Sequence, residues 1–99
     1  MIVLYEDSDI RIAGETVKDL GFMLHCTVSK WSSSVYRKVL WILLKTAEEH
    51  RVVYGMVKDD KQKKFMETLG FTPCEKDVVS HSGTVYGTYK FEVNKWKQQ

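Results

Sequence analysis

A short helix that ends at a glycine and leads directly into an aromatic strand is the feature that most constrains the fold of this sequence. The segment reads Phe65-Met66-Glu67-Thr68-Leu69-Gly70-Phe71. Phe65, Met66 and Leu69 fall on one side of a helix, and Asp59 is suited to cap the start of that helix. Gly70 suits the left-handed residue that follows a helix, because it has no Cβ to clash. The segment therefore predicts a helix buried on one face, a tight corner and a strand.

Within the first 57 residues, the sequence predicts three strands, with one helix between the first and the second and the longest helix between the second and the third. Apolar runs predict strands at residues 2–5, 22–28 and 51–57. Residues 9–20 carry apolar side chains at spacings of three and four, which is typical of a helix. These side chains are Ile10, Ala13, Val17 and Leu20. Gly21 then fits the end of that helix.

The longest predicted helix follows Trp31 and three serines and ends near residues 48–51. A serine before a helix can accept a hydrogen bond from a free N–H group of the first turn. The apolar face of this helix consists of Val35, Val39, Leu43 and Ala47. Trp41 and Ile42 widen the apolar face, and the sequence therefore predicts that the helix packs against a sheet.

The C-terminal part of the sequence predicts an antiparallel hairpin. Residues 71–79 form its first strand, residues 80–83 its turn and residues 85–93 its second strand. Apolar and polar side chains alternate in the second strand, as they do when one face of a strand is buried. With the preceding elements, this hairpin predicts a single α/β domain over residues 1–99, of α+β character and with a mixed sheet.

Length, composition and charge set the outer bounds on function. The chain has 99 residues, of which 43% are hydrophobic and 28% are charged, and this is ordinary for one globular domain. A net charge of +2 is too small to indicate nucleic-acid binding. No apolar run approaches the roughly 18 residues that a membrane span needs. Residues 1–7 do not resemble a signal peptide, so we expect a cytoplasmic protein in which Cys26 and Cys74 are reduced.

The helix corner resembles that of the GCN5-related N-acetyltransferases (GNATs), where the pattern Phe-Tyr-x-x-x-Gly-Phe is typical. From Phe22 onward, the predicted order also resembles the second half of that fold. The order is a central strand, a long helix, a strand splayed from the first, the corner helix and a final hairpin. The resemblance implies an acyl-CoA N-acyltransferase-like fold with a truncated N-terminal half. Short phage-encoded proteins with this fold are similar in size, which suggests a phage or prophage protein in the host cytoplasm or the virion.

The resemblance also implies where a coenzyme A molecule would bind. In the family, a loop of the form Arg/Gln-x-x-Gly-x-Gly/Ala binds the pyrophosphate through backbone N–H groups at a helix N-terminus. The residues implied for this loop are Lys30, Ser32, Ser33, Ser34 and Val35. The residues implied for alignment of the pantetheine arm are Cys26, Thr27 and Val28. Acetyl-CoA or CoA would be the cofactor of an active protein.

Two departures from the family pattern bear on activity. The loop at residues 29–35 contains no glycine, and Met66 stands where the family usually has a tyrosine that acts as general acid. A thioether cannot donate a proton, and nothing in the sequence singles out Tyr54, Tyr86 or Tyr89 as a substitute, so no catalytic residue is assigned. We therefore expect a non-catalytic domain with a structural, assembly or protein-interaction role. The alternative is a small N-acetyltransferase that transfers acetyl from acetyl-CoA to an amine.

The lysine run and the last strand suggest two further kinds of partner. A run of lysines could bind nucleic acid, although the acidic residues around it offset the charge and make a solvated face the simpler interpretation. These lysines are Lys58, Lys61, Lys63 and Lys64. The last strand, if it lies at a sheet edge, would offer its backbone to a second copy in a homodimer or to a strand of another protein.

The histidines and cysteines do not predict a metal site or a nucleophile. His25 and Cys26 are adjacent, but neighbouring residues on a strand point to opposite faces. The sequence has neither a C-x-x-C nor an H-x-x-x-H spacing, which a structural zinc site would favour. We expect Cys26 to be a small buried side chain.

Overall fold

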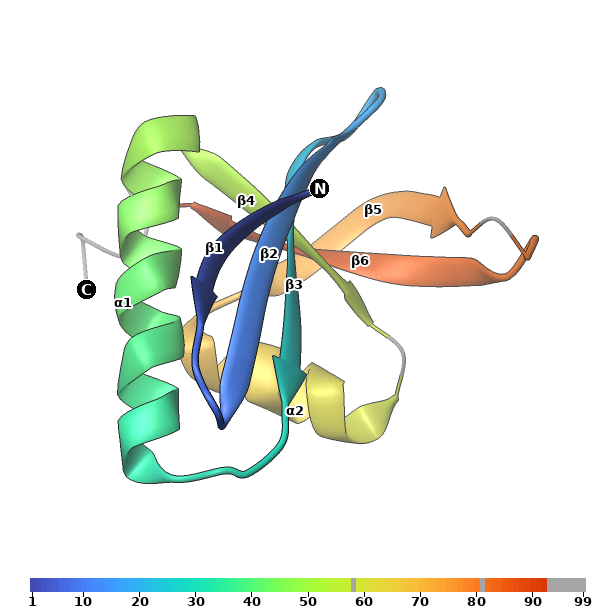
Figure 1. Ribbon diagram of the computed structural model, residues 1–99. Helices are drawn as coiled ribbons and strands as arrows, with labels where there is room; N and C mark the ends of the chain where they lie inside the picture. The colour runs from blue at the N-terminus through green and yellow to red at the C-terminus, as the bar shows by residue number, and fades with distance from the viewer. Residues whose placement is uncertain (58, 81, 93–99) are drawn as a thin grey trace.

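The described residues of the computed structural model, which are 1–57, 59–80 and 82–92, form six strands and two helices. The elements are β1 (Ile2–Glu6), β2 (Ile10–Val17), β3 (Gly21–Val28), α1 (Ser33–His50), β4 (Val52–Val57), α2 (Asp60–Leu69), β5 (Thr72–Val79) and β6 (Val85–Glu92). The strands form one mixed sheet in the order β1-β2-β3-β4-β6-β5 (Figure 1). The α+β class with a mixed sheet and a C-terminal antiparallel hairpin is therefore confirmed. Lys58, His81 and residues 93–99, including the end of the last predicted strand, lie outside the described residues.

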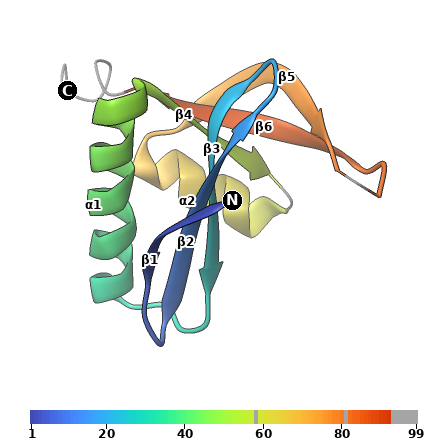
Figure 2. The same ribbon diagram turned by 45° about the horizontal axis from the view of Figure 1, so that its top comes forward.

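One pair of neighbouring strands in the described sheet, β3 with β4, is parallel, and the other pairs are antiparallel. Parallel neighbours need a crossover connection, and α1 supplies it. Helix α2 similarly connects β4 to β5, which lies two positions further along the sheet. The β5–β6 hairpin projects away from α1 in both views (Figures 1 and 2).

The helix predicted at residues 9–20 is wrong, because most of that segment is strand β2. Ile10 and Ile12 are buried and Arg11 between them is exposed, which is the alternation of a strand. Gly14 weakens a helix but suits this strand, since a Cβ there would lie 2.3 Å from Cζ of Phe22. The spacing of the apolar residues is compatible with a helix. The segment is nevertheless a strand, because residues 10–17 all pair with β3.

Helix α1 forms where the sequence predicts it. Ser32 is its N-cap, and its Oγ accepts a hydrogen bond of 3.1 Å from the backbone N–H of Val35. The predicted apolar face is buried, consisting of Val35, Val39, Leu43 and Ala47, with Ile42 beside it. Trp41 does not extend this face, because 59% of its surface is exposed and Lys45 Nζ lies 5.0 Å from its ring centroid.

The corner at the end of α2 also has the predicted geometry. Asp59 caps the helix by accepting a 2.8 Å hydrogen bond from the N–H of Gln62. Gly70 has a φ of 104°, in the left-handed region that glycine adopts without strain. Its N–H donates to the carbonyl of Glu67 at 3.1 Å, and the chain then enters the buried Phe71.

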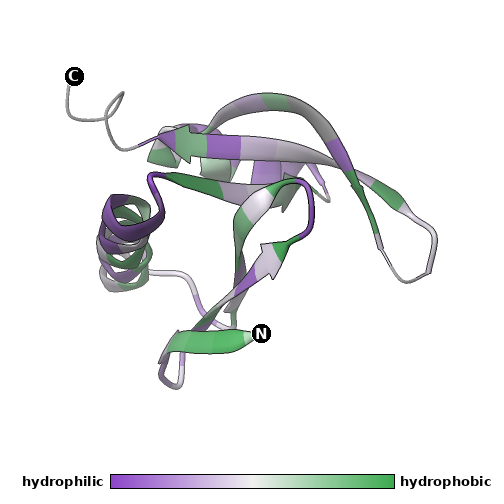
Figure 3. Ribbon diagram, turned by 90° about the horizontal axis from the view of Figure 1, so that it is seen from above, coloured by the Kyte–Doolittle hydropathy of each residue, from purple (hydrophilic) through white to green (hydrophobic). Residues whose placement is uncertain are grey.

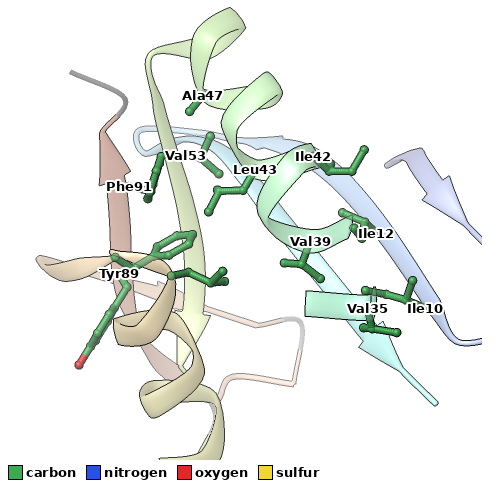
Figure 4. Packing of buried hydrophobic residues seen from close by; sticks show 12 residues of the cluster. Ile10, Ile12, Val35, Val39, Ile42, Leu43, Ala47, Val53, Tyr89 and Phe91 are labelled. Atoms are coloured by element: carbon green, nitrogen blue, oxygen red, sulfur yellow. The ribbon is translucent and has the colours of Figure 1, made fainter. Parts of the chain in front are cut away.

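Both helices lie on the same face of the sheet. Ile12 of β2 belongs to the cluster that buries the inner side of α1. On β4, Val53 lies between Phe91 and Leu43 of α1 (Figure 4). Gly55, on the same face of β4, contacts Met66 of α2. Within the described residues, the opposite face of the sheet therefore carries no helix.

The edges of the sheet are β1 and β5. The condition for pairing through the last strand, an edge position, is not met by the described residues, because β6 pairs with β4 on one side and with β5 on the other. Most of its backbone is already in the sheet, so a homodimer or partner strand cannot add along it. The reason is topological, since β5 pairs outside β6 and takes the edge.

A cluster around Asp7 fixes the β1–β2 turn to α1. The Asp7 carboxylate accepts a 2.8 Å hydrogen bond from the Tyr5 hydroxyl and forms an ion pair with Lys38 of α1. It also accepts hydrogen bonds from the backbone N–H groups of Asp9 and Ile10, at 2.8 and 3.1 Å. The Lys38 ammonium, followed by these hydrogen bonds, holds the pKa of Asp7 well below its usual range.

We predict that Asp7→Asn makes stability less dependent on acidic pH. The Asp7 contribution is fully present above the ordinary pKa of 3.8 and is lost progressively as the pH falls from there toward the lowered folded pKa, because the unfolded chain takes up a proton that folded Asp7 does not bind. Denaturant unfolding from about pH 7 to about pH 2.5 should therefore give a shallower decline in the unfolding free energy for Asp7→Asn than for wild type. Asp77→Asn, which changes an exposed carboxylate of β5, is the control and should keep the wild-type slope. Equal slopes for Asp7→Asn and wild type would contradict the prediction.

We predict that Gly70→Ala lowers the unfolding free energy by about 1–2 kcal/mol, because a Cβ strains the left-handed conformation. Gly87→Ala is the matched control, since a Cβ on Gly87 would meet no atom within 4 Å. That variant should change the unfolding free energy by less than about 0.5 kcal/mol. Equal effects of the two substitutions in denaturant unfolding would show that the corner is not set by Gly70.

Candidate functional site

The candidate site lies where β3 and β4 separate. Their parallel register contains two residue pairs, Phe22 with Val53 and Met23 with Tyr54. By contrast, β3 pairs with β2 over its whole length, and β4 does so with β6. Each strand thus stays in its own half of the sheet, and a gap opens between their C-terminal ends (Figure 1).

A cavity of about 630 Å³ occupies this gap, which we call the wedge. This volume is in the range of small-molecule sites. Its walls come from β3, β4, α1 and α2, and most of them are apolar. Residues that line it include Leu24, Cys26, Val28, Val39, Leu43, Gly55, Met56, Phe65, Met66, Leu69 and Phe71. Polar groups reach it at Asp59, Lys61 and Gln62 near the start of α2.

The structure brings some of the predicted site residues to the wedge. Cys26, Thr27 and Val28, which were predicted to align a pantetheine arm, line it. From the predicted loop, Trp31 lines the wedge. The other loop residues, which are Lys30, Ser32, Ser33, Ser34 and Val35, are not among the described lining residues.

The start of α1 differs from the predicted phosphate cradle. The side chain of Val35 is fully buried in the core, and its N–H donates to Ser32. The expectation that Val35 offers a free N–H group is therefore wrong, because the N-cap serine already uses it. Ser33 and Ser34 are exposed, and their N–H groups belong to the first turn, where helices have no internal acceptors.

Side chains of the protein itself narrow the wedge. A Cβ built on Gly55 would lie 2.9 Å from Cε of Met66, so the methionine packs directly over the backbone of β4. At the other side, the rings of Trp31 and Phe65 meet edge to face, with centroids 4.6 Å apart. Aromatic pairs of this geometry contribute roughly 0.5–1.5 kcal/mol beyond their buried area. This aromatic contact thus holds the loop before α1 against α2.

The titratable groups near the wedge do not form a catalytic pair. The imidazole of His25 is 2.9 Å from Glu15, on the face opposite Cys26, as strand alternation predicted. The expectation that Cys26 is buried is wrong, because the residue is exposed at the end of β3, where the sheet opens. Desolvation by the surrounding protein still raises the pKa of its thiol to about 11, so the thiol is protonated at neutral pH. His50 stacks on Phe22, four residues and about 13 Å along β3 from Cys26.

Sequence reasoning missed two other residues that line the wedge, Gly55 and Trp31. Gly55 was assigned only to a buried strand, yet its lack of a side chain makes room for Met66. Trp31 was regarded only as a bulky loop residue, whereas it contacts Phe65. The inward face predicted for α2 was a usable signal, because it placed Phe65 and Met66 toward the sheet.

Comparisons with protein-family models, with curated proteins and with solved structures each found no match. Among the described residues, no group of three or more histidine, cysteine, aspartate or glutamate side chains is arranged to hold a metal ion. Neither of the two helices described is long and apolar enough to cross a membrane.

Proposed function

We propose that this chain is a shortened GNAT-like domain that does not transfer acetyl groups and acts by binding another protein chain, in a structural or assembly role. The order of its elements supports the resemblance. A central strand (β3) precedes a long helix (α1), and the next strand (β4) splays from the first. The corner helix (α2) and the final hairpin (β5–β6) follow.

The position of Met66 carries the proposal. The family pattern has a tyrosine at this point of the corner helix, where it serves as general acid. Met66 is directed into the wedge and packs over Gly55, as expected for a side chain at that position. A thioether has no proton to give to a departing thiolate. The cavity is therefore present, but Met66, which stands at the position of the family's general acid, cannot donate a proton.

The other parts of the site support the same conclusion. The N–H of Val35 is occupied by Ser32, which leaves a smaller donor set at the start of α1. Trp31 of the loop before α1 packs edge to face against Phe65 of α2. The proposal extends to a phage or prophage origin, in the host cytoplasm or the virion, on the basis of chain size and the corner motif.

The alternative is a small N-acetyltransferase that uses acetyl-CoA. The observation that favours it is the wedge, since an apolar cavity between strand ends could hold a pantetheine arm beside the exposed backbone of β3 and β4. In this alternative, Cys26, Thr27 and Val28 line the arm, and the N–H groups of Ser33 and Ser34 bind phosphate. The neutral amine would attack the thioester carbon, the C–S bond would break, and water would take the proton from the new amide nitrogen and supply one to the departing thiolate.

Titration calorimetry with acetyl-CoA and with CoA separates the two functions. Our proposal predicts no measurable binding by wild type at ligand concentrations up to about 1 mM. Binding in the micromolar range would contradict it, provided that it is lost in Ser33→Pro and retained in Ser33→Ala. Proline is tolerated at the first helical position and removes the N–H group, whereas alanine keeps it. Circular dichroism of both variants verifies that α1 is intact.

A further inference from the structure

The two edges of the sheet differ in how they are protected. An edge strand presents unpaired backbone N–H and C=O groups, which can pair with a strand from another chain. On β5, Pro73 provides no N–H group and Asp77 places a charge on the edge. Strand β5 is therefore poorly suited to accept a partner strand.

Strand β1 has the opposite character. Three of its four exposed side chains are aliphatic, with exposed fractions of 65% for Ile2, 46% for Val3 and 36% for Leu4, and the fourth is Glu6. Neither a lysine nor a proline interrupts it, and its one irregularity falls at the apolar Leu4. Figure 3 shows β1 as a continuous hydrophobic segment at the margin of the sheet. An exposed apolar edge is a template for pairing with a strand of another chain, and exposed apolar patches mark interaction sites.

The apolar side chains of β1 occupy both faces of the sheet. Ile2 is in register with Gly14, on the face that carries the helices. Val3 is in register with the buried Ala13, on the opposite face. A helix packed on one face would cover only one of these side chains. A strand placed alongside β1 would cover both, because its own side chains also alternate between the faces.

We propose that the β1 strands of two copies of this chain pair antiparallel about a two-fold axis, so that the two sheets become one continuous sheet. The charges of β1 are compatible with self-pairing and favour the antiparallel arrangement over the parallel one. Glu6 is the one acidic or basic side chain in β1, and it lies 3.4 Å from Arg11 of β2. Antiparallel self-pairing places the two Glu6–Arg11 pairs at opposite ends of the seam and aliphatic residues at its centre. Parallel pairing would set Glu6 beside Glu6, which is repulsive.

This inference rests on the proposed interaction role, since it names the partner. It can nevertheless fail independently, because its test contains no CoA. A two-fold interface is self-complementary, so each residue of β1 meets a residue of the same short apolar strand. The five residues of β1 limit the seam, and we therefore expect a dimer whose population depends on concentration.

The test is sedimentation velocity of the full chain from about 10 μM to about 1 mM, in wild type and in two double variants. Ile2→Lys with Leu4→Lys places cations on both copies at the seam and should abolish the dimer. Val79→Lys with Val85→Lys is the matched control, because these valines are 64% and 60% exposed and belong to β5 and β6. That variant should dimerise like wild type. Thermal unfolding of each variant verifies that it is folded.

Each outcome decides the inference. Dimerisation that is lost only in the β1 variant supports it. A wild type that stays monomeric at about 1 mM overturns it, and the β1 edge would then be a site for a strand of a different protein. A dimer that survives in the β1 variant, or that is lost in the control, also overturns it and places the interface elsewhere.

Discussion

The separation of β3 and β4 after two residue pairs is the constraint on which the rest of the structure depends. Each strand is fully paired on its other side, so the sheet behaves as two halves joined at one end. Side chains of α1 and α2 must then fill the space that backbone pairing leaves open. Val39, Leu43 and Met66 meet there, and the wedge is the volume they do not fill. Core packing and a potential ligand site are thus the same region of this molecule.

A second consequence concerns the outer surfaces. Because both helices cover one face, the anchorage of β1 comes from β2 and from the Asp7 cluster, through Lys38 of α1. The turn after β1 is therefore fixed, while its aliphatic side chains stay exposed. A firmly held but uncovered edge strand is pre-organised for pairing, since little backbone entropy remains to be lost on association. This agrees with a protein that works through contact with another chain.

The sequence predicted the elements whose ends are set by local chemistry. Ser32, Asp59 and Gly70 define helix ends through groups within a few residues, and all three predictions were confirmed. Strand β2 was predicted as a helix, because its nature depends on pairing with β3 and on Phe22 lying over Gly14. The edge condition for the last strand is not met for a similar reason, since strand order is a long-range property. Cys26, Thr27 and Val28 line the wedge, and so does Gly55, for which the sequence offered no local signal.

The central claim is that the wedge is retained as architecture but does not serve as a coenzyme A site. Backbone amide spectra recorded by ¹H–¹⁵N NMR during titration with acetyl-CoA test it most directly, because they report on each residue separately. The account predicts that the amides of Thr27, Ser33 and Gly55 do not shift at ligand concentrations up to about 1 mM. Saturable shifts confined to these amides and to the wall of α2 would contradict the account and establish the wedge as a binding site.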